Sequence, residues 1–133
     1  MDAKKRVAVP ASWLNGEVGQ TFHVIPHPSG EYLVVMPPKE FELQELEIKG
    51  SVADPKLKRR AIREFFGGSH EVTTDKQGRV LLNDKHCERT GLGSEVVFIG
   101  GRSRFEIWSR EAHIIAKPGQ MEALQQVADL IGL

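Results

Sequence analysis

Two arginines in this chain each follow an aspartate by four positions. Asp2 precedes Arg6, and Asp75 precedes Arg79, so the second pair repeats the first 73 positions later. A guanidinium is planar and permanently charged, which suits it to phosphate contact and to bidentate recognition of guanine. An aspartate at a turn accepts backbone N–H groups or holds the arginine in a fixed pose. The pattern therefore indicates either two DNA-contacting turns or two structural Asp–Arg links at strand starts.

Free positive charge beside the two arginines favours the first interpretation. A structural ion pair needs no additional cations, yet both motifs carry them, as Lys4, Lys5 and Lys76. Gly78 precedes the second arginine and tolerates backbone angles that other residues avoid, so we expect a tight turn or bulge there. These turns should each lead into a short strand, because an apolar run follows each arginine.

The remaining reactive side chains do not form a recognisable catalytic pattern. His23 and His27 have the spacing of helical metal ligands, but prolines at 26 and 28 forbid a helix there. Cys87 is the only cysteine, so it has no second thiol for a structural zinc site or an internal disulfide. The sequence has neither a phosphate-binding Gly-rich loop ending in Lys-Ser or Lys-Thr nor a Gly-x-Ser-x-Gly elbow. We predict no enzyme activity, no catalytic or metal-binding residue, no cofactor and no small-molecule substrate.

Composition fits one compact domain, or two small units that share a core. The chain has 133 residues, 40% of them hydrophobic and 27% charged, with 18 basic and 18 acidic residues. Zero net charge argues against a strongly basic nucleic-acid protein, but local patches steer a polyanion. Residues 2–6 carry three cations and one anion, whereas residues 40–47 carry four glutamates and no cation. With no signal peptide and no long apolar run, we expect a cytoplasmic protein without membrane contact.

Strand-forming stretches recur with the same spacing as the paired motifs. "VGQTFHVIP" corresponds to "LGSEVVFIG", and "GEYLVVMPPKEF" corresponds to "RSRFEIWSREAH". Each half therefore has three or four short strands rich in β-branched and aromatic residues, Phe105 and Trp108 facing a core. We expect a pseudo-twofold α+β protein in which each half completes the other's core.

Three segments have helical patterns. In residues 54–66, Asp54 is a natural N-cap, Pro55 takes the first helical position, and Gly67-Gly68 supply a stop. This helix has an apolar face and a basic face, and the basic face is either a solvated surface or a phosphate contact. "PPKEFELQELEIKG" predicts a shorter acidic helix. "KPGQMEALQQVADLIGL" predicts a C-terminal helix whose inward residues are Met121, Leu124, Ala128 and Ile131.

Together, the order and spacing of these motifs resemble the MraZ family, whose members have two SpoVT-AbrB-type units. The resemblance rests on "DAKKRVAVP", "DKQGRVLL", "TGLGSEVVFIGGRSRFEIWS" and the linker "DPKLKRRAIREFFGG". It implies a double swapped-hairpin β-barrel with flanking helices. It also implies a ring-shaped homo-oligomer that binds short direct repeats in the promoter of the division and cell-wall gene cluster, associated with the nucleoid.

The resemblance also assigns roles to individual positions. Arg6, with Lys4 and Lys5, and Arg79, with Lys76, would contact DNA, while Asp2, Asp75 and Gly78 would shape the turns. The expected divisions are a first unit at 1–42, a helical linker at 43–68, a second unit at 69–113 and a C-terminal helix at 114–133.

Three positions depart from the family pattern. Lys5 stands where glycine is frequent, which would stiffen the first turn or add a DNA contact. Asn83 stands where proline is common, which reduces rigidity. The second unit has an opening strand in "SHEVTTD", whereas the first motif directly follows Met1. We therefore expect the first unit to lack that strand, either in the protein or because the gene start was assigned to an internal Met.

Two alternatives to a DNA-binding regulator stay open at this point. One is an AbrB-type antidote that binds a toxin through its C-terminal helix, although such proteins normally have one unit and a disordered tail. The other is an oligomeric scaffold that does not bind DNA.

Overall fold

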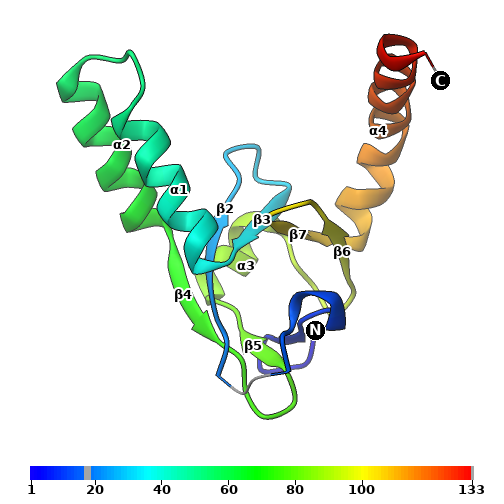
Figure 1. Ribbon diagram of the computed structural model, residues 1–133. Helices are drawn as coiled ribbons and strands as arrows, with labels where there is room; N and C mark the ends of the chain where they lie inside the picture. The colour runs from blue at the N-terminus through cyan, green and yellow to red at the C-terminus, as the bar shows by residue number, and fades with distance from the viewer. Residues whose placement is uncertain (17–18, 133) are drawn as a thin grey trace.

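The structure is a mixed α+β fold, as the sequence predicts. This computed structural model describes residues 1–16 and 19–132 (Figure 1). The strands are β1 (Arg6–Ala8), β2 (Thr21–Pro26), β3 (Tyr32–Met36), β4 (His70–Thr73), β5 (Arg79–Leu81), β6 (Val96–Gly100) and β7 (Phe105–Ser109). The helices are the 3-10 turn η1 (Ala11–Trp13), α1 (Pro38–Lys49), α2 (Pro55–Gly68), α3 (Asp84–Thr90) and α4 (Arg110–Ile131). Val18 and Leu133, at the ends of two predicted elements, lie outside the described residues.

The strands form two antiparallel sheets. β1 and β5 pair as a two-stranded ribbon, and the other five strands are ordered β4-β2-β3-β7-β6. Within residues 1–16 and 19–132 the two sheets form no closed barrel. The ribbon lies at the end of the molecule opposite the projecting helices α1, α2 and α4 (Figure 1).

Reciprocal hydrogen bonds relate the two halves of the chain. The N–H of Val9 donates to the carbonyl of Gly78 at 2.9 Å, and the N–H of Leu82 donates to the carbonyl of Lys5 at 2.9 Å. Both pairs are related by the same 73-residue shift. The sequence repeat therefore corresponds to a local twofold arrangement in which each motif bonds to the other.

One hydrophobic core contains side chains from both halves. Phe22, Leu33 and Val24 come from the first half, and Phe105 and Ile107 from the second; each is at most 1% exposed. Trp108 is also buried, on the opposite face of β7 against Tyr32, so the predicted packing roles of Phe105 and Trp108 are confirmed. On the other face of the large sheet, α1 and α2 pack through a smaller cluster of Val34, Met36 and Phe41, with Phe65 against it.

The predicted inward face of the C-terminal helix is wrong. α4 begins at Arg110 and projects away from the sheet (Figure 1). Met121, Leu124 and Ile131 are 60%, 58% and 67% exposed, and Ala128 is partly exposed. Helical periodicity identifies an apolar stripe, but it cannot show whether the same chain supplies a surface to cover it.

The end of the middle helix also differs from the prediction. Asp54 caps α2 as expected, accepting the N–H of Leu57 at 3.0 Å. However, Gly67 and Gly68 continue the helix, and the C-cap is Ser69. Only the C-cap Ser69 separates the end of α2 from the start of β4 at His70, so the helix ends at the second glycine and not at the first.

Candidate nucleic-acid interface

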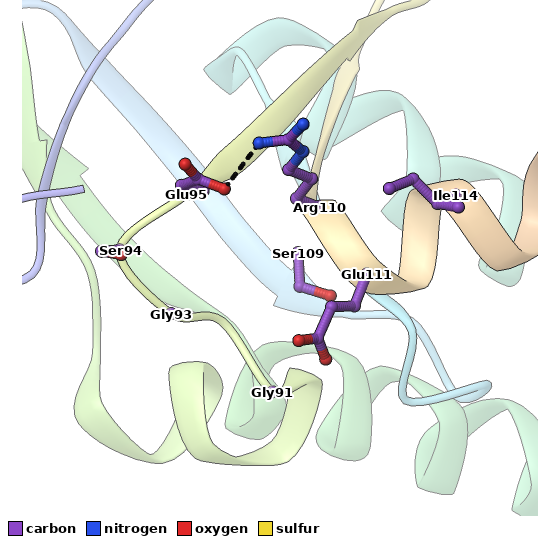
Figure 2. Close-up of a pocket in the computed structure, with 8 residues that line it drawn as sticks. All are labelled: Gly91, Gly93, Ser94, Glu95, Ser109, Arg110, Glu111 and Ile114. Atoms are coloured by element: carbon purple, nitrogen blue, oxygen red, sulfur yellow. Dashed lines mark hydrogen bonds and ion pairs between the residues drawn. The ribbon is translucent and has the colours of Figure 1, made fainter.

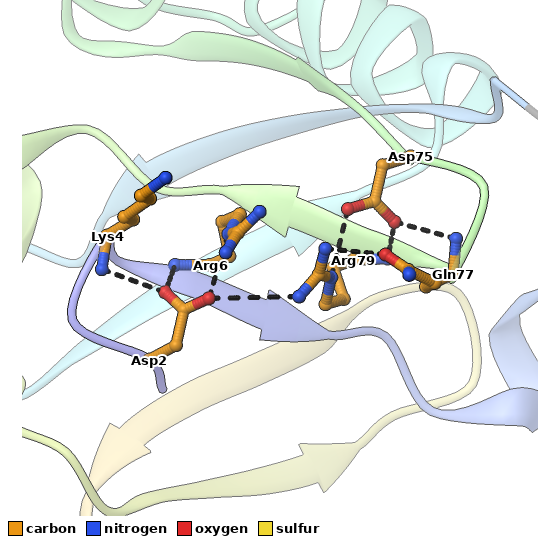
Figure 3. A network of polar contacts seen from close by, with 6 residues as sticks. All are labelled: Asp2, Lys4, Arg6, Asp75, Gln77 and Arg79. Carbon is orange, nitrogen blue, oxygen red and sulfur yellow. Dashed lines mark hydrogen bonds and ion pairs between the residues drawn. The ribbon is translucent and has the colours of Figure 1, made fainter.

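The first motif folds as a compact turn around the Asp2 carboxylate (Figure 3). One carboxylate oxygen accepts the N–H of Lys4 at 3.0 Å and the N–H of Arg6 at 2.9 Å. The other oxygen accepts Nε of Arg6 at 2.8 Å. The backbone bond from Arg6 is the largest factor that lowers the pKa of Asp2, so the carboxylate stays ionised beside the arginine.

The second motif repeats this geometry. Asp75 accepts the N–H groups of Gln77 and Arg79, each at 2.9 Å, and Nε of Arg79 at 3.0 Å. The backbone bond from Arg79 is again the main factor that lowers the pKa of the aspartate. Both aspartates therefore act in the two ways that the sequence indicates: they close the turn and fix the arginine.

The ribbon places both arginines on one outer surface. Arg6 is paired with Leu81, Val7 with Val80, and Ala8 with Arg79. Since side chains alternate along a strand, Val7 and Val80 point to the core, where each is 2% exposed. The outward set consists of Arg6, Ala8, Arg79 and Leu81.

The two arginines are not equivalent. In Arg79, Nη2 lies 2.5 Å from Oε1 of Gln77, and Nη1 lies 3.9 Å from the Asp2 carboxylate. In Arg6, the described part of the chain supplies a partner for Nε only, from Asp2. The terminal nitrogens of Arg6 are thus available to an incoming ligand, whereas those of Arg79 are engaged. Asp2 contacts both guanidinium groups and so links the two motifs.

The neighbouring lysines also differ. Lys4 and Lys76 have exposed side chains. Lys5 instead forms an ion pair with Asp84 at 2.9 Å, and this contact raises the pKa of Lys5. The Asp84 carboxylate is 77% exposed, so this pair contributes little to stability and can exchange for another anion.

This surface also includes Gln77, Leu81 and Asp84, which the sequence motifs do not indicate. Their sequence signals are weak: Gln77 lies in the second motif, Leu81 occupies an outward strand position, and Asp84 begins α3 beside Asn83. Asn83 accepts the N–H groups of Lys85 and His86 and is therefore the N-cap of α3. The unpredicted helix α3 explains why asparagine is suitable at this position.

Gly78 and its counterpart Lys5 share an uncommon backbone conformation. Their φ angles are 75° and 61°, both in the left-handed region. A Cβ atom on Gly78 would also lie only 3.0 Å from Cδ1 of Leu14. Glycine is thus favoured at the second turn for both backbone and packing reasons, while the first turn holds a lysine at some strain.

We expect Gly78→Ala to lower the free energy of unfolding by about 1–3 kcal/mol, because it adds left-handed strain and a contact with Leu14. Urea denaturation followed by circular dichroism measures the change. Gly93→Ala is the matched control, since Gly93 lacks a positive φ and an added Cβ would meet nothing within 4 Å. Equal losses in the two variants would show that Gly78 has no special role in the turn.

A separate polar cavity of about 480 Å³ lies where β6 and α4 begin (Figure 2). Across it, Nη1 of Arg110 is 2.9 Å from a carboxylate oxygen of Glu95. None of the motif residues lines this cavity. Its lining residues are Gly91, Gly93, Ser94, Glu95, Ser109, Arg110, Glu111 and Ile114.

The surroundings of Cys87 and His86 are those of structural residues. Cys87 is 2% exposed, and burial raises the pKa of its thiol, which disfavours the reactive thiolate. Burial lowers the pKa of His86, whose Nε2 lies 3.1 Å from the carbonyl of Gly68. Among the described side chains, no three His, Cys, Asp or Glu residues gather as a metal site would require. No described helix is long and apolar enough to cross a membrane.

The fold and the site together define the class of protein. It is a small α+β protein in which two related turns present arginines on one two-stranded ribbon. Comparison with known proteins identifies the family. Residues 65–125 match the family model described as "MraZ protein, putative antitoxin-like". The "Transcriptional regulator MraZ" of Carboxydothermus hydrogenoformans is 37% identical over 97% of this chain and 89% of its own length. The protein of the same name from Burkholderia vietnamiensis is 32% identical over 91% of this chain and 84% of its own length. The chain belongs to the MraZ family.

Proposed function

We propose that this protein is a sequence-specific DNA-binding transcriptional regulator without enzymatic activity. The observation that carries the proposal is the β1–β5 ribbon, on which Arg6 and Arg79 face outward and each is held at Nε by an aspartate. The curated relatives are named transcriptional regulators, which supports DNA as the partner.

A two-stranded antiparallel ribbon has the width that the major groove of B-DNA admits. In this proposal β1 and β5 enter the groove. Arg6 offers both terminal nitrogens to a guanine edge, while Arg79 is more firmly oriented by Gln77 and Asp2. On the same outward face Leu81 lies opposite Arg6 and Ala8 lies opposite Arg79, and both suit contact with a thymine methyl group.

Phosphate contacts come from the lysines beside the arginines. Lys4 and Lys76 are exposed, and Lys5 can leave Asp84 for a backbone phosphate. These few cations per chain make a single binding site weak and dependent on salt. A ring-shaped homo-oligomer would compensate, because several sites engaging several direct repeats raise the effective concentration at each one.

The finer features in this proposal rest on the family resemblance. They are a double swapped-hairpin barrel built from both sheets, promoter repeats in the division and cell-wall gene cluster, and a cytoplasmic, nucleoid-associated location. The reciprocal bonds between the two motifs support a pseudo-symmetric barrel.

A fluorescence-anisotropy titration tests the function. The labelled duplex carries the direct repeats upstream of the protein's own gene cluster, and the control duplex has the same composition with the repeats scrambled. We expect tighter binding to the repeats, with an affinity that falls as salt increases. Absence of salt-dependent binding to either duplex would favour the scaffold. Equal binding to both would contradict sequence-specific regulation.

A further inference from the structure

The two motif turns have the same backbone, so their side chains can be compared position by position. In both turns the N–H of the aspartate donates to the carbonyl of the motif arginine, at 3.0 Å in the first and 2.8 Å in the second. In both, the residue before the arginine donates its N–H to the carbonyl of the aspartate, at 3.1 Å and 3.0 Å. The 73-residue shift that relates the turns therefore makes Lys4 and Gln77 equivalent positions.

The side chain at this position determines how the arginine is held. Oε1 of Gln77 accepts a hydrogen bond from Nη2 of Arg79 at 2.5 Å (Figure 3). Lys4 has an ammonium group, which cannot accept a hydrogen bond. The guanidinium of Arg6 therefore keeps only its Nε contact with Asp2 in the described part of the chain. The difference between the two arginines follows largely from Gln77.

The contact with Arg79 also determines what Gln77 can offer to a ligand. A glutamine amide has one oxygen that accepts and one nitrogen that donates. Oε1 binds Arg79, whereas Nε2 has no partner in the described part of the chain and the residue is exposed. The guanidinium of Arg79 can only donate. At Gln77 and Arg79 a ligand therefore meets chiefly hydrogen-bond donors.

Donors of this kind distinguish among bases in the major groove. Guanine presents two acceptors and thymine presents one, whereas cytosine presents a donor. Adenine presents an acceptor beside a donor, and its usual contact with glutamine needs the amide oxygen as well as the nitrogen. Since the oxygen of Gln77 already binds Arg79, guanine or thymine suits this position best and cytosine suits it least.

We propose that Gln77 is a specificity-determining residue: its oxygen positions Arg79, and its amide nitrogen donates to a guanine or thymine next to the base that Arg79 contacts. This inference rests on the proposed function and identifies one base pair that the second turn selects. The first turn lacks this selection, because Lys4 is a flexible point charge that suits a phosphate. The same position of the repeat thus gives one turn an additional phosphate contact and the other an additional base contact.

Replacing Gln77 by glutamate separates the two roles of this side chain. Gln77→Glu keeps the size of the side chain and an oxygen for Arg79, but it replaces the amide donor with an acceptor. The probes are a duplex with one direct repeat from upstream of the protein's own gene cluster, and duplexes in which each base pair is replaced in turn. In fluorescence anisotropy we expect wild type to bind about 10-fold more weakly when cytosine replaces the guanine or thymine at one position. Gln77→Glu should reverse that preference and no other, because a carboxylate accepts from N4 of cytosine.

Gln126→Glu is the matched control for the added charge. Gln126 is an exposed residue of α4, so its replacement should leave the preference at every base pair as in wild type. Gln77→Ala, which lacks both amide groups, should reduce the preference at the selected position to less than about twofold. An unchanged base preference in either Gln77 variant, or the same reversal in Gln126→Glu, would overturn the reading role.

Labelling with phenylglyoxal in the absence of DNA tests the positioning role alone. Arg79 in the Gln77→Ala protein should be modified several-fold faster than in the wild-type chain, since its Nη2 loses the bond to Gln77. Arg6 should be modified at the same rate in both proteins. Equal rates at Arg79 would show that Gln77 does not hold this arginine.

The base preferences of the wild-type chain separate this inference from the proposed function. If wild type prefers the repeat to the scrambled duplex but Gln77→Glu keeps the wild-type preferences, the regulator stands and the assignment of Gln77 fails. If wild type shows no preference among the duplexes while Arg79 is labelled as expected, the DNA-binding function and the reading role both fail. In that case only the contact between Gln77 and Arg79 stands.

Discussion

Replacing Arg6 by alanine should weaken binding to a single promoter repeat about 10- to 100-fold, while the free energy of unfolding changes by less than about 1 kcal/mol. The loss arises because Arg6 is the motif arginine whose terminal nitrogens have no described protein partner. The stability change is small because its ion pair with Asp2 is about one-third exposed. Fluorescence anisotropy and urea denaturation measure the two quantities.

Arg63→Ala provides the control for this variant. It removes the same charge from α2, at the end of the molecule away from β1 and β5 (Figure 1), so single-repeat affinity should be unchanged. Arg79→Ala should weaken binding less than Arg6→Ala, since its guanidinium is already engaged by Gln77 and Asp2. An Arg6→Ala protein with wild-type affinity would remove Arg6 from the interface.

Replacing Phe105 by alanine should lower the free energy of unfolding by about 3–5 kcal/mol, the usual range for a buried phenylalanine. Phe105 is 1% exposed. Its ring centroid lies 5.0 Å from that of Trp13, 5.9 Å from Phe22 and 6.0 Å from Phe98. Because these contacts join the two halves of the chain, unfolding should occur in a single transition in both proteins.

Phe66→Ala is the matched control, since Phe66 is 40% exposed on α2 and lies outside the main core. It should be clearly less destabilising than Phe105→Ala. Thermal unfolding followed by both near- and far-ultraviolet circular dichroism detects the transitions. Two separate transitions, or equal losses for the two variants, would contradict a core shared by both halves.

The sequence was sufficient to predict the strands and the two turns. The 73-residue repeat places related residues in related environments, and the structure confirms this at Asp2 and Asp75, whose hydrogen bonds are nearly identical. Strand positions followed from β-branched and aromatic runs between glycines. Each of these signals depends only on residues that are close together in the sequence, so the sequence of one chain is enough to predict them.

Tertiary relationships could not be predicted in the same way. The sequence predicts that the apolar side of α4 faces inward, because helical periodicity identifies an apolar side without showing what covers it. Likewise, the ion pair of Lys5 with Asp84 joins residues 79 positions apart, and the shared contact of Asp2 with Arg79 depends on how β1 meets β5. The sequence does not indicate the short helix α3, because the N-cap role of Asn83 is evident only once the helix that it begins is known.

The most direct test of the account is arginine footprinting with phenylglyoxal, read by mass spectrometry, with and without the promoter duplex. DNA should protect Arg6 most strongly and Arg79 to a lesser extent, with no change at Arg59, Arg60 and Arg63 of α2. Protection confined to the α2 arginines, with Arg6 and Arg79 equally reactive in both samples, would contradict the assignment of the β1–β5 ribbon as the DNA-binding surface.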